Sequence, residues 1–319
     1  MTAILLTLAG LALILVAAYY FTEGASSLAK RFGISEFVIG MTVVAFGTGA
    51  PELMITSLSA IKGSGDIAVG NIVGSNIFNL LLILGISALI LPLPLTRKNK
   101  LEDIPFLVLS SVVLLLVAIF PLGSDVHKIS HGEGLLMLGF FAFFLYYTIR
   151  SGKGKGAAAE KCGKTVSCGK NIWMVLLMLV GGLAALLFGA NIFVEGSVEV
   201  ARRLGMSEAA IAVTLIAAGT SFPELAINVV SVLKKKPGMA LGNIIGSNTF
   251  NVFAVLGTGA TIHPITMTGI IPGDLIFMVV TGVLLFLSAF VLRRNYLNRT
   301  EGVIFILLYI AYIWWMLAR

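Results

Sequence analysis

The stretch GTGAPEL, Gly47 to Leu53, interrupts an apolar run, and it recurs as GTSFPEL, Gly219 to Leu225. Each copy contains a glutamate, Glu52 or Glu224, at a depth where a chain embedded in lipid rarely carries charge. Subtracting position 52 from position 224 gives an offset of 172 residues, and the similarity at this offset extends well beyond the motif. The two stretches therefore predict a duplicated chain with one buried acid in each half.

The composition is that of a membrane protein. The chain has 319 residues, of which 58% are hydrophobic and 12% charged, with a mean hydropathy of +1.02. Soluble domains typically carry about 25% charged residues. The net charge of +7 is spread over many loops, which argues against a nucleic-acid partner. Two cysteines, Cys162 and Cys168, are too few and too close together to indicate a disulfide framework or a metal site.

Apolar length predicts an all-α integral membrane fold with ten transmembrane helices, because each span of the bilayer needs about 20 apolar residues. The N-terminus lacks a basic segment and a cleavage pattern, so it is interpreted as the first span. We expect the ten spans at 2–21, 34–61, 67–93, 104–121, 133–150, 172–201, 206–233, 238–262, 272–292 and 301–318.

The distribution of basic residues predicts the orientation. With the N-terminus outside, 17 of the 22 lysines and arginines fall on the cytoplasmic side and 5 outside. Cytoplasmic loops are enriched in these residues. We therefore expect a multi-pass protein of the cell membrane with both termini outside and a basic cytoplasmic linker at 151–171.

The repeat divides the chain into five-helix halves at 1–150 and 172–319, with the shared motifs at 40–80 and 212–252. Because five spans separate equivalent positions, the two halves have opposite orientations in the membrane. Inverted-topology repeats are typical of alternating-access transporters. Spans one and six lack an acid at mid-depth and contain glycines such as Gly181, Gly182 and Gly189, so we expect them to be the sliding elements.

Other polar residues recur at regular spacing from the two acids. Pro51 and Pro223 precede them and predict a broken helix, since proline removes a helical hydrogen bond. Thr48 and Thr220 stand four residues before the acids, on the same helix side. Ser221 adds a hydroxyl that its counterpart, Gly49, lacks. A second stripe repeats in both halves: Asn71, Ser75 and Asn79, then Asn243, Ser247 and Asn251.

Two functions are open for this polar stripe. Polar side chains on membrane helices often only join helices, and for Asn71 and Asn243 that interpretation and a ligand role remain equally open. We expect Ser75, Asn79, Ser247 and Asn251 to belong to a site. Carboxylate, amide and hydroxyl oxygens without His or Cys favour Ca²⁺ or Na⁺ over zinc and copper. His127 and His131 are expected to be solvated loop residues.

The sequences GTGAPEL with GNIVGSNIFN, and GTSFPEL with GNIIGSNTFN, resemble the two alpha-repeats of the sodium/calcium exchangers, in the compact prokaryotic form. The resemblance covers nearly the whole chain. It implies electrogenic Na⁺/Ca²⁺ antiport through four central sites, no enzymatic activity and no cofactor. It implies that the calcium ligands are Glu52 and Glu224 with the backbone carbonyls of Thr48 and Thr220, and that Asn79 faces the centre. The sodium sites would use Ala45, Thr48, Ser75, Ala217, Thr220, Ser221 and Ser247.

Two residues depart from the family pattern. Gly49 occupies a position where compact exchangers often have serine, which leaves the sodium stoichiometry open. Asn251 replaces an aspartate found in several relatives, which argues against potassium dependence.

Other functions were weighed as well. The GN-x-x-E pattern of proton-coupled relatives is missing at both acids, yet Ca²⁺/H⁺ exchange stays an alternative. A passive channel is disfavoured by the inverted repeat. An intramembrane enzyme is disfavoured because no second nucleophile or base stands out. The expected partners are the two ions and the bilayer, and we expect a monomer.

Overall fold

The computed structural model describes residues 2–120, 128–152, 171–206, 219–267, 272–290 and 295–318. Ala217, His127, both cysteines and all but the ends of the linker lie outside these ranges. The first half contains α1 (Thr2–Phe32), α2 (Glu36–Ile39), η1 (Gly40–Val44), α3 (Ala45–Thr48), α4 (Ala50–Ile61), α5 (Gly65–Ile77), η2 (Phe78–Ile83), α6 (Leu84–Ile90), β1 (Leu93–Pro94), η3 (Asn99–Asp103), α7 (Ile104–Ile119), β2 (Lys128–Ile129) and α8 (His131–Gly152).

The second half contains α9 (Ile172–Arg203), α12 (Phe222–Leu233), α13 (Pro237–Phe250), η5 (Asn251–Leu256), α14 (Gly257–Ile262), β3 (Ile265–Thr266), α15 (Pro272–Phe290), β4 (Tyr296–Leu297) and α16 (Arg299–Leu317), where η denotes a π-helical segment. Within the described ranges, eight helices and one bent pair are long and apolar enough to cross a membrane. These nine match predicted spans. The remaining span is represented by α12, which follows the undescribed segment 207–218.

The first helix is longer than predicted. Its apolar run ends near residue 21, but α1 continues to Phe32. Thr22 and Ser26 are buried in this extension, and Glu23 forms an ion pair with Lys234 at 2.5 Å. Apolar length therefore located the lipid-facing part of α1, whereas its polar end is stabilised by contacts with the protein.

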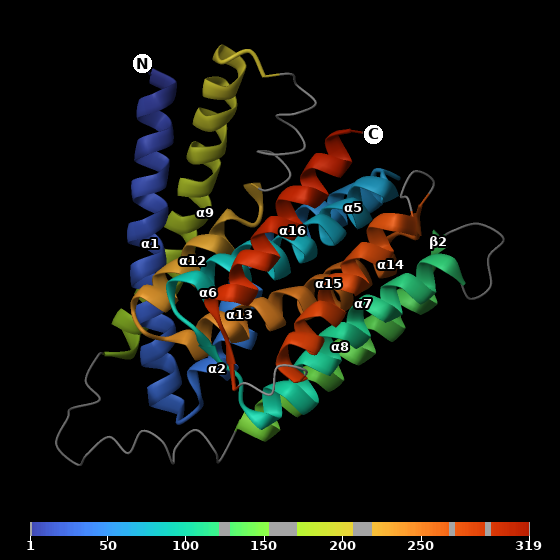
Figure 1. Cartoon of the computed structure of the whole chain (residues 1–319), viewed down its shortest axis with the longest axis horizontal. Helices are drawn as coiled ribbons and strands as arrows, with labels where there is room; N and C mark the ends of the chain where they lie inside the picture. Colours follow the sequence, from blue (N-terminus) through green and yellow to red (C-terminus); the bar gives the residue numbers. More distant parts are fainter. Residues whose placement is uncertain are drawn as a thin grey trace.

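The two long helices α1 and α9 form an antiparallel pair that extends beyond the rest of the bundle (Figure 1). Glycines set their close approach. A Cβ at Gly10 would meet Phe193, and one at Gly182 would meet Phe21, which is the same contact in the other repeat. Spans one and six therefore pack against each other along glycines, and their sliding stays a prediction.

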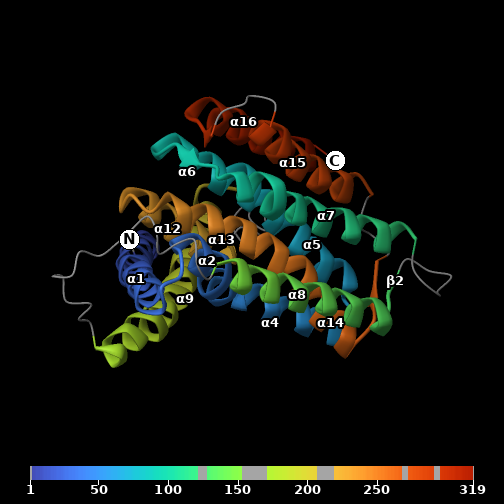
Figure 2. The ribbon, with the colours of Figure 1, turned by 90° about the horizontal axis from the view of Figure 1, so that it is seen from below.

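The centre of the bundle is formed by the two motif-bearing helical stretches. The most apolar window of Pro237–Ile262 is 100% buried and that of Gly65–Ile90 is 78% buried, against 22–39% for the other unbroken spans. Figure 2 shows α13 between a layer with α6 and α7 and a layer with α4 and α8. Gly242 and Gly246 allow α13 to approach the backbones of Phe37 and Met41, as the small-residue spacing predicts.

Short strand pairs tie the halves together. Strand β1 pairs antiparallel with β4, and β2 pairs antiparallel with β3. Strands β1 and β3 occupy equivalent repeat positions, because Leu93 and Ile265 differ by the repeat offset. Each half therefore contributes a strand to the other half at equivalent places, and the acids are held between interlocked repeats.

Candidate cation site

Both acids lie at helix breaks. The helix of Glu36–Thr48 bends by 47° into Ala50–Ile61, with Gly49 at φ −77° and ψ 5° between them. Ser221 has nearly the same backbone, φ −94° and ψ 2°, before α12. Pro51 and Pro223 occupy the first turn of α4 and of α12. The predicted broken helix is confirmed in the first repeat, whereas residues 207–218, which precede the second break, lie outside the described ranges. Each glutamate thereby lies in the first turn of a half-helix, where unpaired N–H groups favour a negative charge.

The two carboxylates meet at the centre of the molecule. Glu52 is 1% exposed and Glu224 is 2% exposed. Glu52 Oε1 accepts hydrogen bonds at 3.4 Å from Ser75 and from Ser221, one hydroxyl from each repeat. The charge of Glu52 repels that of Glu224, which faces the Thr48 side chain. The Oε2 atoms of both acids are buried and have no hydrogen-bond partner.

Four asparagines join the two repeats beside the acids. Asn76 donates to the Asn248 carbonyl at 3.3 Å, and Asn251 donates to Asn76 Oδ1 at 3.1 Å. Asn79 donates to Asn248 Oδ1 at 3.4 Å. These bonds leave Oδ1 of Asn79 and of Asn251 buried without a partner. Both residues lie in π-helical segments, η2 and η5, which are frequent at functional sites.

The role of Asn76 and Asn248 was missed from the sequence. Both residues recur at the repeat offset inside the GN-x-x-GSN motif, and that signal was available. Their function in the structure is to connect α5 and α13, so they orient the amides of Asn79 and Asn251.

The other predicted ligands differ in what they contact. Thr48 donates to the Val44 carbonyl at 3.2 Å, whereas Thr220 Oγ1 is buried without a partner. Ser247 donates to Asn243 Oδ1 at 3.4 Å. The Ala45 carbonyl accepts the Gly49 N–H at 3.0 Å. The structure therefore brings Glu52, Ser75 and Ser221 into direct hydrogen bonding and leaves Ala217 outside the described residues.

One turn beyond each acid lies another buried polar side chain. Asn228 is fully buried, and neither atom of its amide has a partner. Its repeat equivalent, Thr56, is equally buried with an unpartnered hydroxyl. The spacing of four residues from Glu224 and Glu52 was visible in the sequence and was not used.

A cavity of about 460 Å³ leads toward the acids from one side. Its walls are α4 and α9, and it reaches Pro51, Thr220 and Pro223 next to the site. The equivalent region of the other repeat, between α12 and α1, is packed: Ala18, Thr22 and Ile227 are each 0% exposed there. The site is therefore approached from one end of the molecule and covered at the other.

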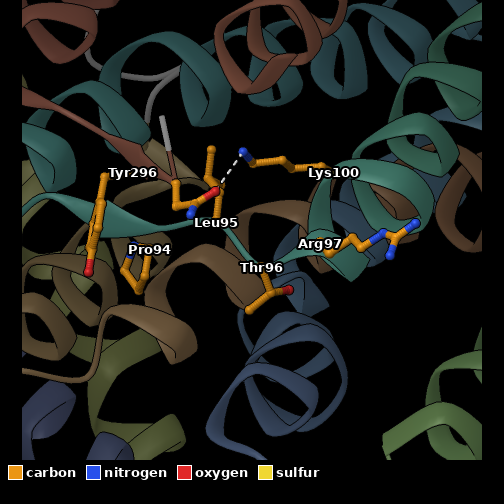
Figure 3. Close-up of a pocket in the computed structure, with 7 residues that line it drawn as sticks. Pro94, Leu95, Thr96, Arg97, Lys100 and Tyr296 are labelled. Carbon is orange, nitrogen blue, oxygen red and sulfur yellow. Dashed lines mark hydrogen bonds between the residues drawn. The ribbon is translucent and has the colours of Figure 1, made fainter. Parts of the chain in front are cut away.

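Another hollow, of about 520 Å³, lies at the strand pair β1–β4 away from the acids. Figure 3 shows its two basic side chains extending in opposite directions, with Lys100 bonded to Asn295 at 3.1 Å and Arg97 turned away. These cations do not converge on a common point. The hollow is separate from the cation site.

A family model described as sodium/calcium exchanger protein matches residues 2–150 and 174–318. The chain belongs to the sodium/calcium exchanger family. It is 38% identical to the putative antiporter CaxA of Alkalimonas amylolytica over 98% of both chains. It is 32% identical to the sodium/calcium exchanger MaX1 of Methanosarcina acetivorans over 97% of both chains.

The fold of this family member is shared with a solved exchanger. The structure of the sodium-calcium exchanger NCX_Mj soaked with zero Na⁺ and Ca²⁺ is similar with a TM-score of 0.82. The two proteins are 29% identical, and the match covers 98% of each chain. The resemblance derived from the doubled motif is therefore confirmed over the full length, as is the antiporter class.

Proposed function

We propose that this chain exchanges Na⁺ for Ca²⁺ at the centre of the bundle, with Glu52 and Glu224 as the shared ligands. The observation that carries this proposal is a set of four buried oxygens without partners: Oε2 of Glu52 and of Glu224, and Oδ1 of Asn79 and of Asn251. Buried polar atoms are normally hydrogen-bonded. Acceptors left unpaired beside two carboxylates are suited to a cation.

The chemistry of these oxygens fits both ions. Ca²⁺ prefers several carboxylate, amide and carbonyl oxygens, and Na⁺ uses the same hard donors at lower charge. Because both ions need the carboxylates, they compete for the site instead of occupying it together. An empty site leaves two repelling charges in a low-dielectric interior, which is unfavourable. This competition couples the movement of one ion to that of the other.

The cavity on one side of the site and the close packing on the other support alternating access. We propose that both termini are outside and that the basic linker is cytoplasmic, as the charge bias predicts. The cavity between α4 and α9 then faces outward, and the pair α1 and α9 shifts to exchange the open and closed sides. One chain supplies both halves of the site, so we propose a monomer as the transport unit.

The test is uptake of ⁴⁵Ca²⁺ into proteoliposomes driven by an outward Na⁺ gradient. Wild-type protein is expected to accumulate Ca²⁺ only when Na⁺ is present inside. Glu52→Gln is expected to lower uptake at least about 100-fold, since removing one partner from a buried charged set typically costs 3–5 kcal/mol. Glu199→Gln is the matched control, because Glu199 pairs with Arg203 at the surface.

Two results would reject the proposal. One is Na⁺-independent uptake by the wild type. The other is full uptake by Glu52→Gln while the protein remains folded.

A further inference from the structure

One buried acid lies outside the cation site. The acidic side chains buried in the described part of the chain are Glu52, Asp103, Glu133, Glu224 and Glu301. Glu52 and Glu224 form the cation site. Glu133 and Glu301 each accept a backbone N–H from the residue three positions earlier, as in a helix cap. Asp103 remains, and the repeat offset relates it to an apolar residue, Leu275. The fold of a repeat therefore does not require a carboxylate at this position.

The partners of Asp103 leave one of its oxygens without a close donor from a cation. Oδ2 accepts a hydrogen bond from Asn99 Nδ2 at 2.9 Å. Oδ1 lies 4.0 Å from Lys98 Nζ, which is too long for a hydrogen bond. Asp103 is 3% exposed, and a buried carboxylate is costly unless it is closely paired. Another cation within hydrogen-bond distance of Oδ1 would therefore stabilise it.

A cavity of about 210 Å³ lies beside Asp103, between the start of α7 and the end of α8. Glu102 and Thr148 line it together with Asp103. Thr148 is 1% exposed, and its Oγ1 has no hydrogen-bond partner. Because buried hydroxyls are normally hydrogen-bonded, an unpartnered one in the wall of a cavity indicates a polar ligand.

The rest of the lining is aromatic and consists of Phe106, Phe143, Phe144 and Tyr147. Phe106 stacks on Phe144 with ring centroids 5.2 Å apart, and Phe143 stacks on Tyr147 at 6.2 Å. The Tyr147 hydroxyl donates to Glu102 Oε2 at 2.6 Å, which fixes a ring and a carboxylate together. Aromatic faces attract cations, so the rings and the acids favour the same kind of ligand.

The lining favours an ammonium group over a metal ion. Ca²⁺ takes six to eight oxygen ligands, whereas here two carboxylates and one hydroxyl are set among four rings. The volume equals that of roughly seven water molecules at about 30 Å³ each, which suits a small amine. The protein's own Lys98 ammonium lies beside the cavity, 5.7 Å from the centroid of the Tyr147 ring.

We propose that this cavity binds a small primary amine in its ammonium form. The ammonium group pairs with Asp103 and Glu102 and donates to the Thr148 hydroxyl, and the apolar part of the ligand lies against the rings. Lys98 competes with the ligand for Asp103. Primary ammonium groups occur in soluble amines and in ethanolamine lipid headgroups, and the experiment separates these two sources.

The test is isothermal titration of purified protein in dodecyl maltoside with benzylammonium chloride, against protein-free micelles. D103N is expected to weaken binding at least about tenfold, because it removes a buried charged acceptor. T148V is expected to weaken binding about threefold, and E102Q about two- to fivefold, since Glu102 is exposed. K98Q is expected to strengthen binding by about two- to fivefold, because it removes the competing ammonium.

Two controls define the result. D274N changes the repeat equivalent of Glu102, outside the cavity, and is expected to bind as the wild type does. Benzyl alcohol has nearly the same shape without the charge, and it is expected not to bind. Equal binding of benzyl alcohol, or an unchanged affinity in folded E102Q and T148V, overturns the proposal even where D103N does not fold. Absence of benzylammonium binding to the wild type also overturns it.

Nanodiscs distinguish the source of the ammonium group. The titration is repeated in phosphatidylglycerol discs with and without phosphatidylethanolamine. An affinity at least about threefold weaker with phosphatidylethanolamine supports the lipid headgroup as the occupant, because it then competes with benzylammonium. An equal affinity in both discs supports a soluble amine.

Discussion

The helices that carry the two acids, α4 and α12, have similar sequences and very different surroundings. Met54 and Leu58 of α4 are 65% and 51% exposed and line the cavity beside α9. Their repeat equivalents on α12, Ala226 and Val230, are 6% and 7% exposed and pack beneath α1. Two copies of one pattern therefore adopt an open and a closed arrangement in the same molecule.

The difference between α4 and α12 identifies the contacts that must break on one side and form on the other in an alternating-access cycle. The closed side is stabilised by Lys234, whose Nζ pairs with Glu23 at 2.5 Å and lies 3.5 Å from the centroid of the Tyr19 ring. Lys236 adds longer ion pairs to Glu23 and Glu36, at 3.8 and 4.0 Å. We call Glu23, Glu36, Lys234 and Lys236 the inner ion cluster. The equivalent of Lys234 on the open side, Lys62, is exposed, so the cluster distinguishes the two sides.

The largest expected effect is a difference in access to the two faces. In a background with both loop cysteines replaced by serine, Met54→Cys is expected to react with a membrane-impermeant thiosulfonate from outside. Ala226→Cys is expected to react from inside about 10- to 1000-fold more slowly, because a minor conformer typically holds 0.1–10% of the population. The rates are measured in ion-free right-side-out and inside-out vesicles, respectively.

Equal rates at the two positions would contradict the comparison. A slow Met54→Cys combined with a fast Ala226→Cys would reverse the proposed orientation of the open side.

A smaller effect is expected from removing the main contact of the inner ion cluster. Lys234→Gln loses the ion pair with Glu23 and the contact with Tyr19. Together these contribute about 1–2 kcal/mol, so labelling of Ala226→Cys from inside is expected to increase roughly tenfold. Lys62→Gln is the matched control on the open side and should leave this rate unchanged. No change in Lys234→Gln would show that helix packing alone closes this side.

Much of this arrangement was predictable from the sequence. Apolar length predicted the spans, and the repeat offset predicted that Glu52 and Glu224 converge, because equivalent positions of an inverted repeat meet near its axis. The close packing of Phe250 against Gly49, where a Cβ would lie 2.8 Å from the ring, was not predictable in this way. The offset relates Phe250 to Phe78 and Gly49 to Ser221, whereas the contact joins two positions that the repeat does not relate.

The open and closed sides were also beyond sequence reasoning. Both helices carry the same motif, and the choice between their arrangements depends on small free-energy differences between packed states. The extension of α1 beyond residue 21 was also missed, because it depends on packing against other helices and not on apolar length. Thr22 and Ser26 appear as lipid-incompatible residues in the sequence, but they are buried against protein in the structure.

The smallest expected effect concerns pH at the inner ion cluster. Burial lowers the pKa of Lys236, and this outweighs the opposing attraction of Glu23 and Glu36, while Lys234 and Lys30 lower it further. Lys236 therefore loses its proton at lower pH than an ordinary lysine as the solution becomes alkaline. The two glutamates then lose one cationic partner, and the closed side is weakened. Labelling of Ala226→Cys from inside is expected to rise about two- to threefold, as for a surface ion pair.

Because thiol reactivity also rises with pH, the labelling rate measured with Lys236 present is divided by the rate in a K236Q background at the same pH. This ratio is expected to lie below one near neutral pH and to rise toward one at alkaline pH, which would support Lys236 as the titrating group. A ratio that stays constant with pH would show that Lys236 does not control the closed side.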